Sequence, residues 1–392
     1  MLLALNLRPT ITSLGAVLDR IQDDIGLSGT IAGVATTMPV LAFATVGACV
    51  PALVKRTGLI PGVLLANALL GAGLILRAVT GTSVVWLLIW TAVATSGIAI
   101  ANVLLPSLVS QFFPRSPGPV TGAYTMALQI GSSIGAGLTV PLAHALGGWQ
   151  GGLGIWAVLA IIASPPWLAL LVRDRNTSTA SSERAHTVAA AGDNRSPAPP
   201  ERLRLWRNNL AWGLAVMFGM QALSAYVIMG WLPQIYRDAG LSAGASGALL
   251  AVVMGIAAPI ALALPLIAVR LTDQRIVVAV VTASLGAGYV GLIAAPAAAS
   301  WLWAVFLGVG SGAFPLALGL ISLRSRTSAG TTALSAFAQS TGYVLAAAGP
   351  VVVGALHQFT GSWLAPLGLL LVLLVPQLWG GLIAAQNRYV DD

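Results

Sequence analysis

The chain has little charge, and this excludes an ordinary water-soluble fold. Only 8% of its 392 residues are charged, whereas 57% are hydrophobic. Soluble domains carry about 25% charged residues. A chain with this balance is expected to be an integral membrane protein, with lipid around most of its surface.

Cysteine is nearly absent, and so are phosphate-binding loops. Cys49 is the single cysteine, which excludes an intrachain disulfide and a metal site built from several thiolates. No segment matches the GxxxxGK loop, followed by Ser or Thr, that binds the phosphates of ATP. We therefore predict no cofactor and no metal, and we do not expect this chain alone to drive transport with ATP.

Carboxylates are missing from the middle of every apolar run. All eleven acidic residues lie at predicted helix ends, in loops or in tails. A proton relay through an embedded Asp or Glu has no candidate here. An enzyme would need an embedded catalytic cluster and a receptor would need an output domain, and the sequence offers neither. These absences favour a transporter that is not an enzyme.

The apolar residues form runs of membrane-spanning length. A transmembrane helix needs about 20 mostly apolar residues. Gly, Pro and charge divide the chain into twelve such runs, which predicts an all-α membrane protein of two six-helix halves. The predicted helices are 2–19, 30–53, 60–79, 84–111, 119–145 and 151–172 in the first half, and 208–235, 245–270, 275–295, 300–323, 330–356 and 363–385 in the second.

A polar stretch separates the halves and predicts three parts: an N-terminal half at 1–172, a flexible linker at 173–207 and a C-terminal half at 208–392. The linker is rich in Ser, Thr, Ala, Pro and charge, so it cannot bury a core. An internal repeat supports the division, because Gly-Leu-Ser at 26–28 recurs at 240–242 after the first helix of each half. Pseudo-symmetric halves are typical of transporters with a binding site between repeats.

The basic residues indicate the orientation. With the N-terminus inside the cell, the predicted inner loops, linker and tail hold 15 Lys and Arg, and the outer loops hold three. By the positive-inside rule, both termini are then cytoplasmic in a bacterial inner membrane. The net charge of +8 follows this topology rather than forming one patch, so nucleic acid is not a predicted partner.

Arg8 is the one charge placed inside a predicted span and away from its ends. At 1.5 Å per residue it lies about 10 Å from the start of the helix. A cation at this depth costs about 2.5–3.5 kcal/mol on insertion scales, so it normally faces a wet cavity or a partner. The alternative is that the side chain snorkels to the cytoplasmic surface. If Arg8 faces a cavity and has no carboxylate partner, it would attract an anionic or electron-rich solute.

Helical periodicity suggests further site residues. Thr12 shares a stripe with Arg8, whereas Asn6, Thr10 and Ser13 form an opposite stripe suited to helix packing. Thr91, Thr95 and Asn102 form a polar stripe on the fourth helix, and Gln339 shares a face with Tyr343. Gln221 and Tyr226 are 140° apart, so an unkinked helix is not expected to direct both at one ligand. The predicted substrate-binding set is Arg8, Thr12, Asn102, Gln129, Tyr226, Trp231 and Gln339.

Several of these segments resemble one family. The stretch Asn6–Ser13, NLRPTITS, resembles the NLRP-type signature of the cyanate and 2-nitroimidazole transporter family within the major facilitator superfamily. Gln221–Tyr226, Trp231–Ile235 and Gly240–Gly247 are similar to that family too. The loop 51–58 departs from the superfamily pattern, because it keeps basic residues and Gly but lacks the usual acidic residue.

The resemblance implies twelve helices, alternating access by rocking of the two halves, and a cavity lined by helices one, four, seven and ten with contributions from five and eleven. It also implies that Arg8 meets an anion such as cyanate, or the nitro group of a nitroimidazole. We therefore predict a monomeric secondary or facilitative transporter whose partners are the bilayer and a small anionic or polar solute. The alternative is a multidrug efflux transporter of the same fold.

Overall fold

The computed structural model describes residues 1–80, 82–113, 115, 117–184, 205–271, 273–326 and 328–390. Its elements are helices, and eleven segments of this described part are long and apolar enough to cross a membrane. They are α4 (Gly29–Thr57), α5 (Leu59–Thr80), α6 (Val84–Phe112), α7 (Pro117–Ala145), α8 (Trp149–Gly154) with α9 (Ala157–Arg184), α10 (Asn209–Asp238), α11 (Ala243–Arg270), α12 (Arg275–Ala294), α13 (Ser300–Gly310) with α14 (Ala313–Leu323), α15 (Ser328–Thr360) and α16 (Leu364–Ala384). The predicted all-α membrane fold is confirmed.

The first predicted helix is divided into three short ones: α1 (Leu2–Leu7), α2 (Pro9–Ala16) and α3 (Leu18–Ile25). The first break falls at Arg8, directly before Pro9. Proline has no backbone N–H to donate, so the hydrogen-bond ladder of the helix is interrupted here, although Arg8 itself keeps α-helical dihedral angles of φ −93° and ψ −32°. The predicted span 2–19 is therefore helical but interrupted, first at Arg8 and again at Val17.

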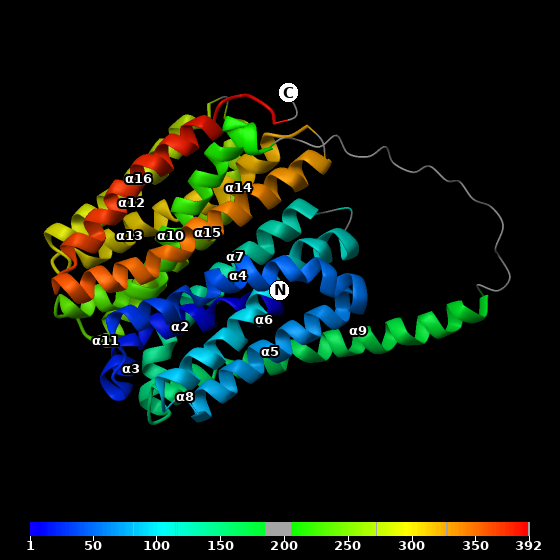
Figure 1. Cartoon of the computed structure of the whole chain (residues 1–392), viewed down its shortest axis with the longest axis horizontal. Coiled ribbons are helices and arrows are strands. Elements are labelled where there is room, and N and C mark those ends of the chain that lie inside the picture. Colours follow the sequence, from blue (N-terminus) through cyan, green and yellow to red (C-terminus); the bar gives the residue numbers. More distant parts are fainter. Residues whose placement is uncertain are drawn as a thin grey trace.

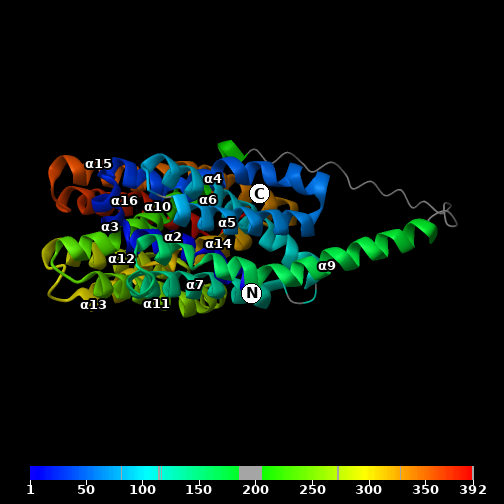
Figure 2. The same cartoon turned by 90° about the horizontal axis from the view of Figure 1, so that it is seen from below.

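Around the predicted linker, the structure describes both flanks. Helix α9 continues to Arg184, and a short 3-10 turn, η1 (Leu205–Arg207), precedes α10. Figure 2 shows α9 extending past the neighbouring helices. The remaining predicted linker residues, 185–204, lie outside the described residues.

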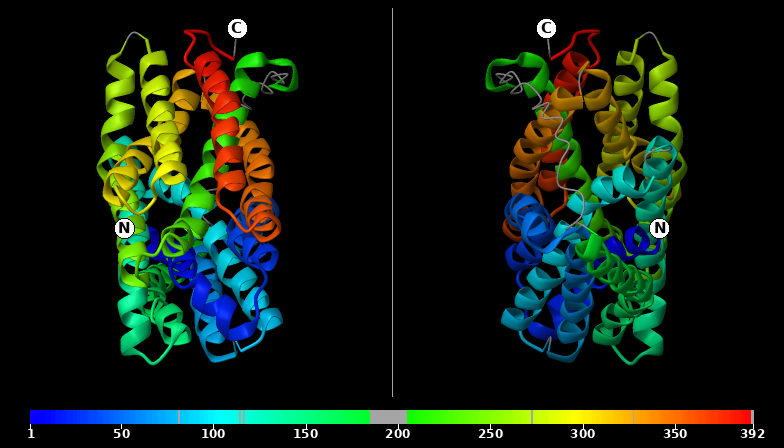
Figure 3. Two further views of the ribbon diagram at one scale, coloured as in Figure 1. Left: turned by 90° about the vertical axis from the view of Figure 1, so that its left-hand side faces the viewer. Right: turned by 90° about the vertical axis from the view of Figure 1, so that its right-hand side faces the viewer.

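The helices form two bundles side by side, the N half (α1–α9) and the C half (α10–α16). Figure 3 looks along the long axis, with the yellow, orange and red helices of the C half above the blue and cyan helices of the N half. We call the end where α9 stops and α10 begins the linker end, and the opposite end, where α10 stops and α11 begins, the far end. In Figure 1 the linker end lies to the right.

The halves meet along three pairs of helices: α4 with α15, α7 with α11, and α2 with α10. Glycine allows the closest approaches. A Cβ on Gly33 of α4 would lie 2.7 Å from the Pro350 carbonyl oxygen of α15, and one on Gly15 would lie 2.2 Å from the Met229 carbonyl oxygen. Small residues at helix crossings in membranes permit this contact. Towards the linker end, the ribbons of α4 and α15 diverge (Figure 1).

We predict that Gly33→Ala destabilises the protein by about 1–3 kcal/mol, because the new methyl group meets backbone atoms that cannot move aside. Thermal unfolding in detergent measures the effect. Gly368→Ala is the matched control, because a Cβ on this α16 glycine meets no atom within 4 Å. Equal stability of the two variants would contradict the close contact between α4 and α15.

Candidate functional site

A central cavity of about 540 Å³, counted to its open mouth, lies between the two halves. The N half contributes residues at the α1–α2 break and on α7, and the C half contributes residues of α10, α11, α14 and α15. Its lining residues are Arg8, Thr125, Gln129, Gln221, Ala222, Ala225, Tyr226, Met229, Met254, Ala257, Ala261, Ser311, Phe314, Pro315 and Tyr343. No Asp, Glu, His or Lys is among them.

Arg8 supplies the charge of this cavity. The residue is only 8% exposed, and its Nε atom has no hydrogen-bond partner. Its Nη1 atom lies 3.8 Å from the Met229 sulfur, which is a weak acceptor. The guanidinium also interacts electrostatically with the hydroxyl groups of Tyr226 and Tyr343. The helix break at Pro9 thus places a cation, with neutral neighbours, beside the cavity.

Another buried arginine shows what full pairing looks like in this fold. Arg324, at the linker end of the C half, donates from Nε to the Ala384 carbonyl at 2.7 Å and from Nη2 to the Gln274 side chain at 2.8 Å. It also donates to the Ala385 carbonyl at 3.1 Å. Burial lowers the pKa of Arg324, and nearby Tyr389 acts in the opposite direction. Compared with Arg324, the Arg8 guanidinium has fewer of its N–H donors paired with oxygen acceptors.

Aromatic rings form one wall of the cavity. Tyr226, Phe314 and Tyr343 line it directly. Behind them, Phe43 of α4 lies 5.2 Å from the Tyr343 ring, and Phe218 of α10 lies 5.1 Å from the same ring. These separations are typical of tilted and edge-to-face aromatic pairs. The cavity therefore combines one cation and several neutral hydrogen-bonding groups with flat apolar surface.

Three of the seven predicted site residues, Arg8, Gln129 and Tyr226, line this cavity. The other four lie outside its lining, and each has a partner for its side chain. Thr12 donates to the Ser132 carbonyl at 3.0 Å, Asn102 to the Ile98 carbonyl at 3.0 Å, Trp231 to the Pro350 carbonyl at 3.1 Å, and Gln339 to the Ser335 hydroxyl at 2.7 Å.

Gln221 was not expected to share a site with Tyr226, yet both line the cavity. The reason is the width of the exposed face of α10. Ala222, Ala225 and Met229 also line the cavity, and at 100° per residue they fill the arc between the two polar side chains. This run of small and flexible residues is the signal that could have identified the face from the sequence.

The far end is closed by polar contacts between the halves. Asp19 of α3 forms an ion pair with Arg237 of α10. The Gln358 side-chain oxygen of α15 accepts from both the backbone N–H and the hydroxyl of Thr30 on α4, at 2.9 and 2.8 Å. Both contacts join an N-half helix to a C-half helix. They lie beyond the central cavity on the side away from the linker.

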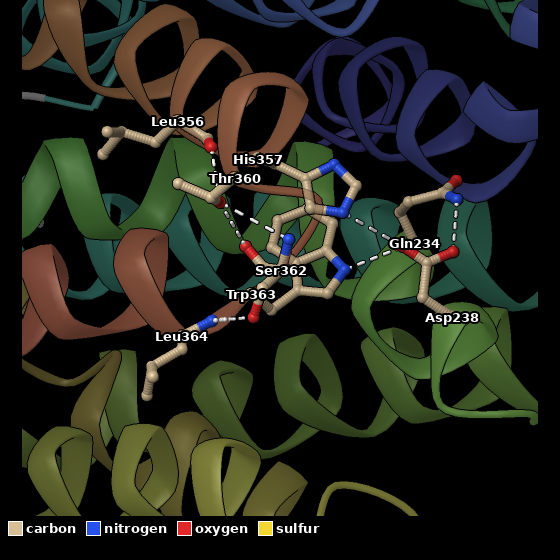
Figure 4. Close-up of polar contacts among 8 residues, drawn as sticks. All are labelled: Gln234, Asp238, Leu356, His357, Thr360, Ser362, Trp363 and Leu364. Atoms are coloured by element: carbon tan, nitrogen blue, oxygen red, sulfur yellow. Dashed lines mark hydrogen bonds and ion pairs between the residues drawn. The ribbon is translucent and has the colours of Figure 1, made fainter.

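A second network ties the far end of the C half together, as Figure 4 shows. Asp238 accepts from the Gln234 amide at 2.8 Å and from the Trp363 indole at 2.7 Å. His357 lies 3.5 Å from the same carboxylate and stacks on Trp363 with ring centroids 3.9 Å apart. This network fixes the ends of α10 and α15 where they carry the contacts with the N half.

The fold and the cavity between its halves define the class of the protein as a helical membrane transporter. The chain belongs to the Major Facilitator Superfamily, whose family model matches residues 5–350. It is 34% identical to the 2-nitroimidazole transporter of Escherichia coli (strain K12) over 351 residues, which are 89% of this chain and 85% of that one. Bacterial relatives of this kind and the many apolar helices agree with a multi-pass protein of the inner membrane.

The chain is also 29% identical to the cyanate transport protein CynX of Escherichia coli (strain K12) over 350 residues, which are 89% of this chain and 86% of that one. The predicted resemblance to the family of these two transporters is confirmed. Among solved structures, a D-xylose-proton symporter has the same fold, with a TM-score of 0.68 and 17% identity over 98% of this chain and 94% of that one.

We predict that the affinity for a solute whose own charge is constant between about pH 5.5 and 8 does not change over this range, because no His, Asp or Glu lines the cavity. Thermal-shift titrations across this range measure it. A tenfold change with a midpoint near the ordinary pKa of histidine would show that a titrating protein group controls the site.

Proposed function

We propose that this protein carries a small anionic or electron-rich solute across the inner membrane by alternating access, with the solute held at Arg8. The observation that carries the proposal is the guanidinium of Arg8 in a cavity between the halves, with no carboxylate in the lining. A cation buried without a counter-charge is costly. A negatively charged or electron-rich solute would supply the missing partner.

The rest of the lining supports a planar solute. Gln129 and Gln221 offer amide donors, and Tyr226, Phe314 and Tyr343 offer ring faces. A flat group can lie between such rings while its acceptor atoms reach Arg8, because the guanidinium is itself planar and can donate to two acceptor atoms at once. The relatives named for 2-nitroimidazole and for cyanate agree with this chemistry.

A multidrug efflux transporter is the second candidate. Met229, Met254 and Phe314 give the cavity a soft apolar part that suits varied ligands. Organic cations, however, would meet Arg8 and no carboxylate. We therefore expect neutral and anionic compounds to compete for the site and cationic dyes to fail.

We infer from the closed far end the side from which solute enters this state. In this state the Asp19–Arg237 and Thr30–Gln358 contacts hold the far ends of the halves together, while α4 and α15 diverge towards the linker end (Figure 1). With both termini cytoplasmic, as the basic residues predict, this state would admit solute from the cytoplasmic side. One chain supplies both walls of the cavity, so we propose that the monomer is the working unit.

Arg8→Ala tests the site. We expect it to weaken solute binding by about 2–3 kcal/mol, roughly 30- to 150-fold, because hydrogen bonds to a charged group are lost. Uptake of labelled cyanate and of 2-nitroimidazole into proteoliposomes should fall accordingly. Arg8→Lys should retain part of the activity if charge alone suffices, and little if a planar two-point contact is needed. Arg207→Ala, which removes an exposed cation at the linker end, is the control. Unchanged uptake by the Arg8→Ala protein would rule out this site.

Asp19→Asn tests whether the ion pair between Asp19 and Arg237 holds the far end closed. Loss of the ion pair should shift the protein towards a state that is open at the far end. Spin labels on cysteines placed at Asp23 and Phe359, two exposed far-end positions on opposite halves, report the separation in a Cys49→Ser background. We expect a population at longer distance. Asp24→Asn is the control, because Asp24 accepts from Trp149 within the N half. If the two variants give the same distances, the ion pair is not a gate.

A further inference from the structure

A second, smaller cavity of about 270 Å³ lies closer to the far end than the central one. Its volume is counted to its open mouth, and its lining residues belong to α2, α4 and α6 of the N half and, at Gly230, to α10. Thr36 of α4 and Thr91 of α6 fall within the first dozen residues of helices that begin at the far end. The central cavity, in contrast, is lined by the middle of its helices.

Four threonines give this cavity its polarity, and two of them are unsatisfied. Thr36 and Thr95 donate to carbonyls of their own helices, at 3.1 Å to Ala32 and at 2.8 Å to Thr91. The hydroxyl oxygens of Thr10 and Thr91 are buried without a hydrogen-bond partner, and both residues are 2% exposed. A buried hydroxyl without a partner is unfavourable. Both groups can therefore donate to an acceptor that enters the cavity.

The two cavities are close neighbours. Arg8 and Met229 line the central cavity, whereas Thr10 and Gly230 line the second one. Arg8 and Thr10 are two residues apart in the sequence, and Met229 and Gly230 are consecutive, so the two linings adjoin along the chain. Arg8 and Met229 also contact each other, with 3.8 Å between the Arg8 Nη1 atom and the Met229 sulfur. Within the lining of the second cavity, Gly230 packs so closely on Thr36 that a Cβ on the glycine would lie 2.9 Å from the threonine Cβ.

We propose that the second cavity is a transit station for the solute on its way between Arg8 and the far end. This inference rests on the proposed function. The hydroxyls of Thr10 and Thr91 donate hydrogen bonds to the acceptor atoms of the solute, such as the ends of a small anion or the oxygens of a nitro group. The station holds no cation, so it binds more weakly than Arg8 and releases the solute when the far end opens. Sites that follow one another with moderate affinity favour passage.

The test uses a double variant, Thr10→Val with Thr91→Val, which removes both hydroxyls and keeps the shape of each side chain. Thr37→Val is the matched control, because Thr37 is also buried with an unpartnered hydroxyl but lines neither cavity. Affinity is measured by thermal shift with cyanate and 2-nitroimidazole, and maximal transport rate by uptake into proteoliposomes at saturating solute.

We expect the double variant to keep its affinity within about twofold and to lose at least fivefold in maximal rate, with both quantities unchanged in the control. The double variant Thr10→Ser with Thr91→Ser keeps the hydroxyls and should retain the rate. Transport by the valine variant at the wild-type rate would overturn the station, and so would an equal loss in the serine variant. If the wild-type protein neither binds nor carries the two probes, the proposed function fails first and the station with it.

Discussion

The guanidinium of Arg8, at the break between α1 and α2, is buried beside the central cavity without a carboxylate partner, and the proposed transport depends on this incomplete pairing. Proline at position 9 ends the helix there, and the arginine before it lines a cavity with neutral neighbours. Arg324 shows that this fold can satisfy a buried arginine with carbonyl and amide oxygens. At Arg8 it supplies a methionine sulfur and the neutral hydroxyl of Tyr226 instead. A binding site for an anion is a place where a cation is held ready and not neutralised, because a strong internal partner would compete with the solute.

Close packing of the halves makes this charge useful for transport. Gly15 and Gly33 bring α2 against α10 and α4 against α15, and the polar contacts of Asp19 and Thr30 lie at the same far end. Separating these contacts breaks none of the backbone hydrogen bonds within the helices, so it costs less than unfolding either half. A carrier needs this balance, because its two halves must rock as rigid bodies around the site. The threonine-lined cavity lies where that separation would begin, between the central site and the closed end.

Much of the fold could be predicted from the sequence, because apolar length and the distribution of basic residues are strong signals in a bilayer. The break at Arg8 and its position in a cavity followed from Pro9 and from the missing carboxylates. The remaining site was harder. Trp231, Asn102 and Gln339 lie on predicted transmembrane helices, but their side chains donate hydrogen bonds to carbonyl groups or to a hydroxyl group of the protein. Helical periodicity in the sequence does not show which polar side chains find such partners within the fold. Ala222 and Ala225, which carry no functional group, mark the cavity face of α10 through their small size.

The most direct measurement is the position of a bound anion. Selenocyanate resembles cyanate in shape and charge and contains a selenium atom that scatters anomalously. In crystals of the protein soaked with it, we expect an anomalous peak in the central cavity, with the anion within hydrogen-bond distance of the Arg8 guanidinium and beside the rings of Tyr226 and Tyr343. A peak outside this cavity, or an anion in the cavity held without contact to Arg8, would contradict the central claim.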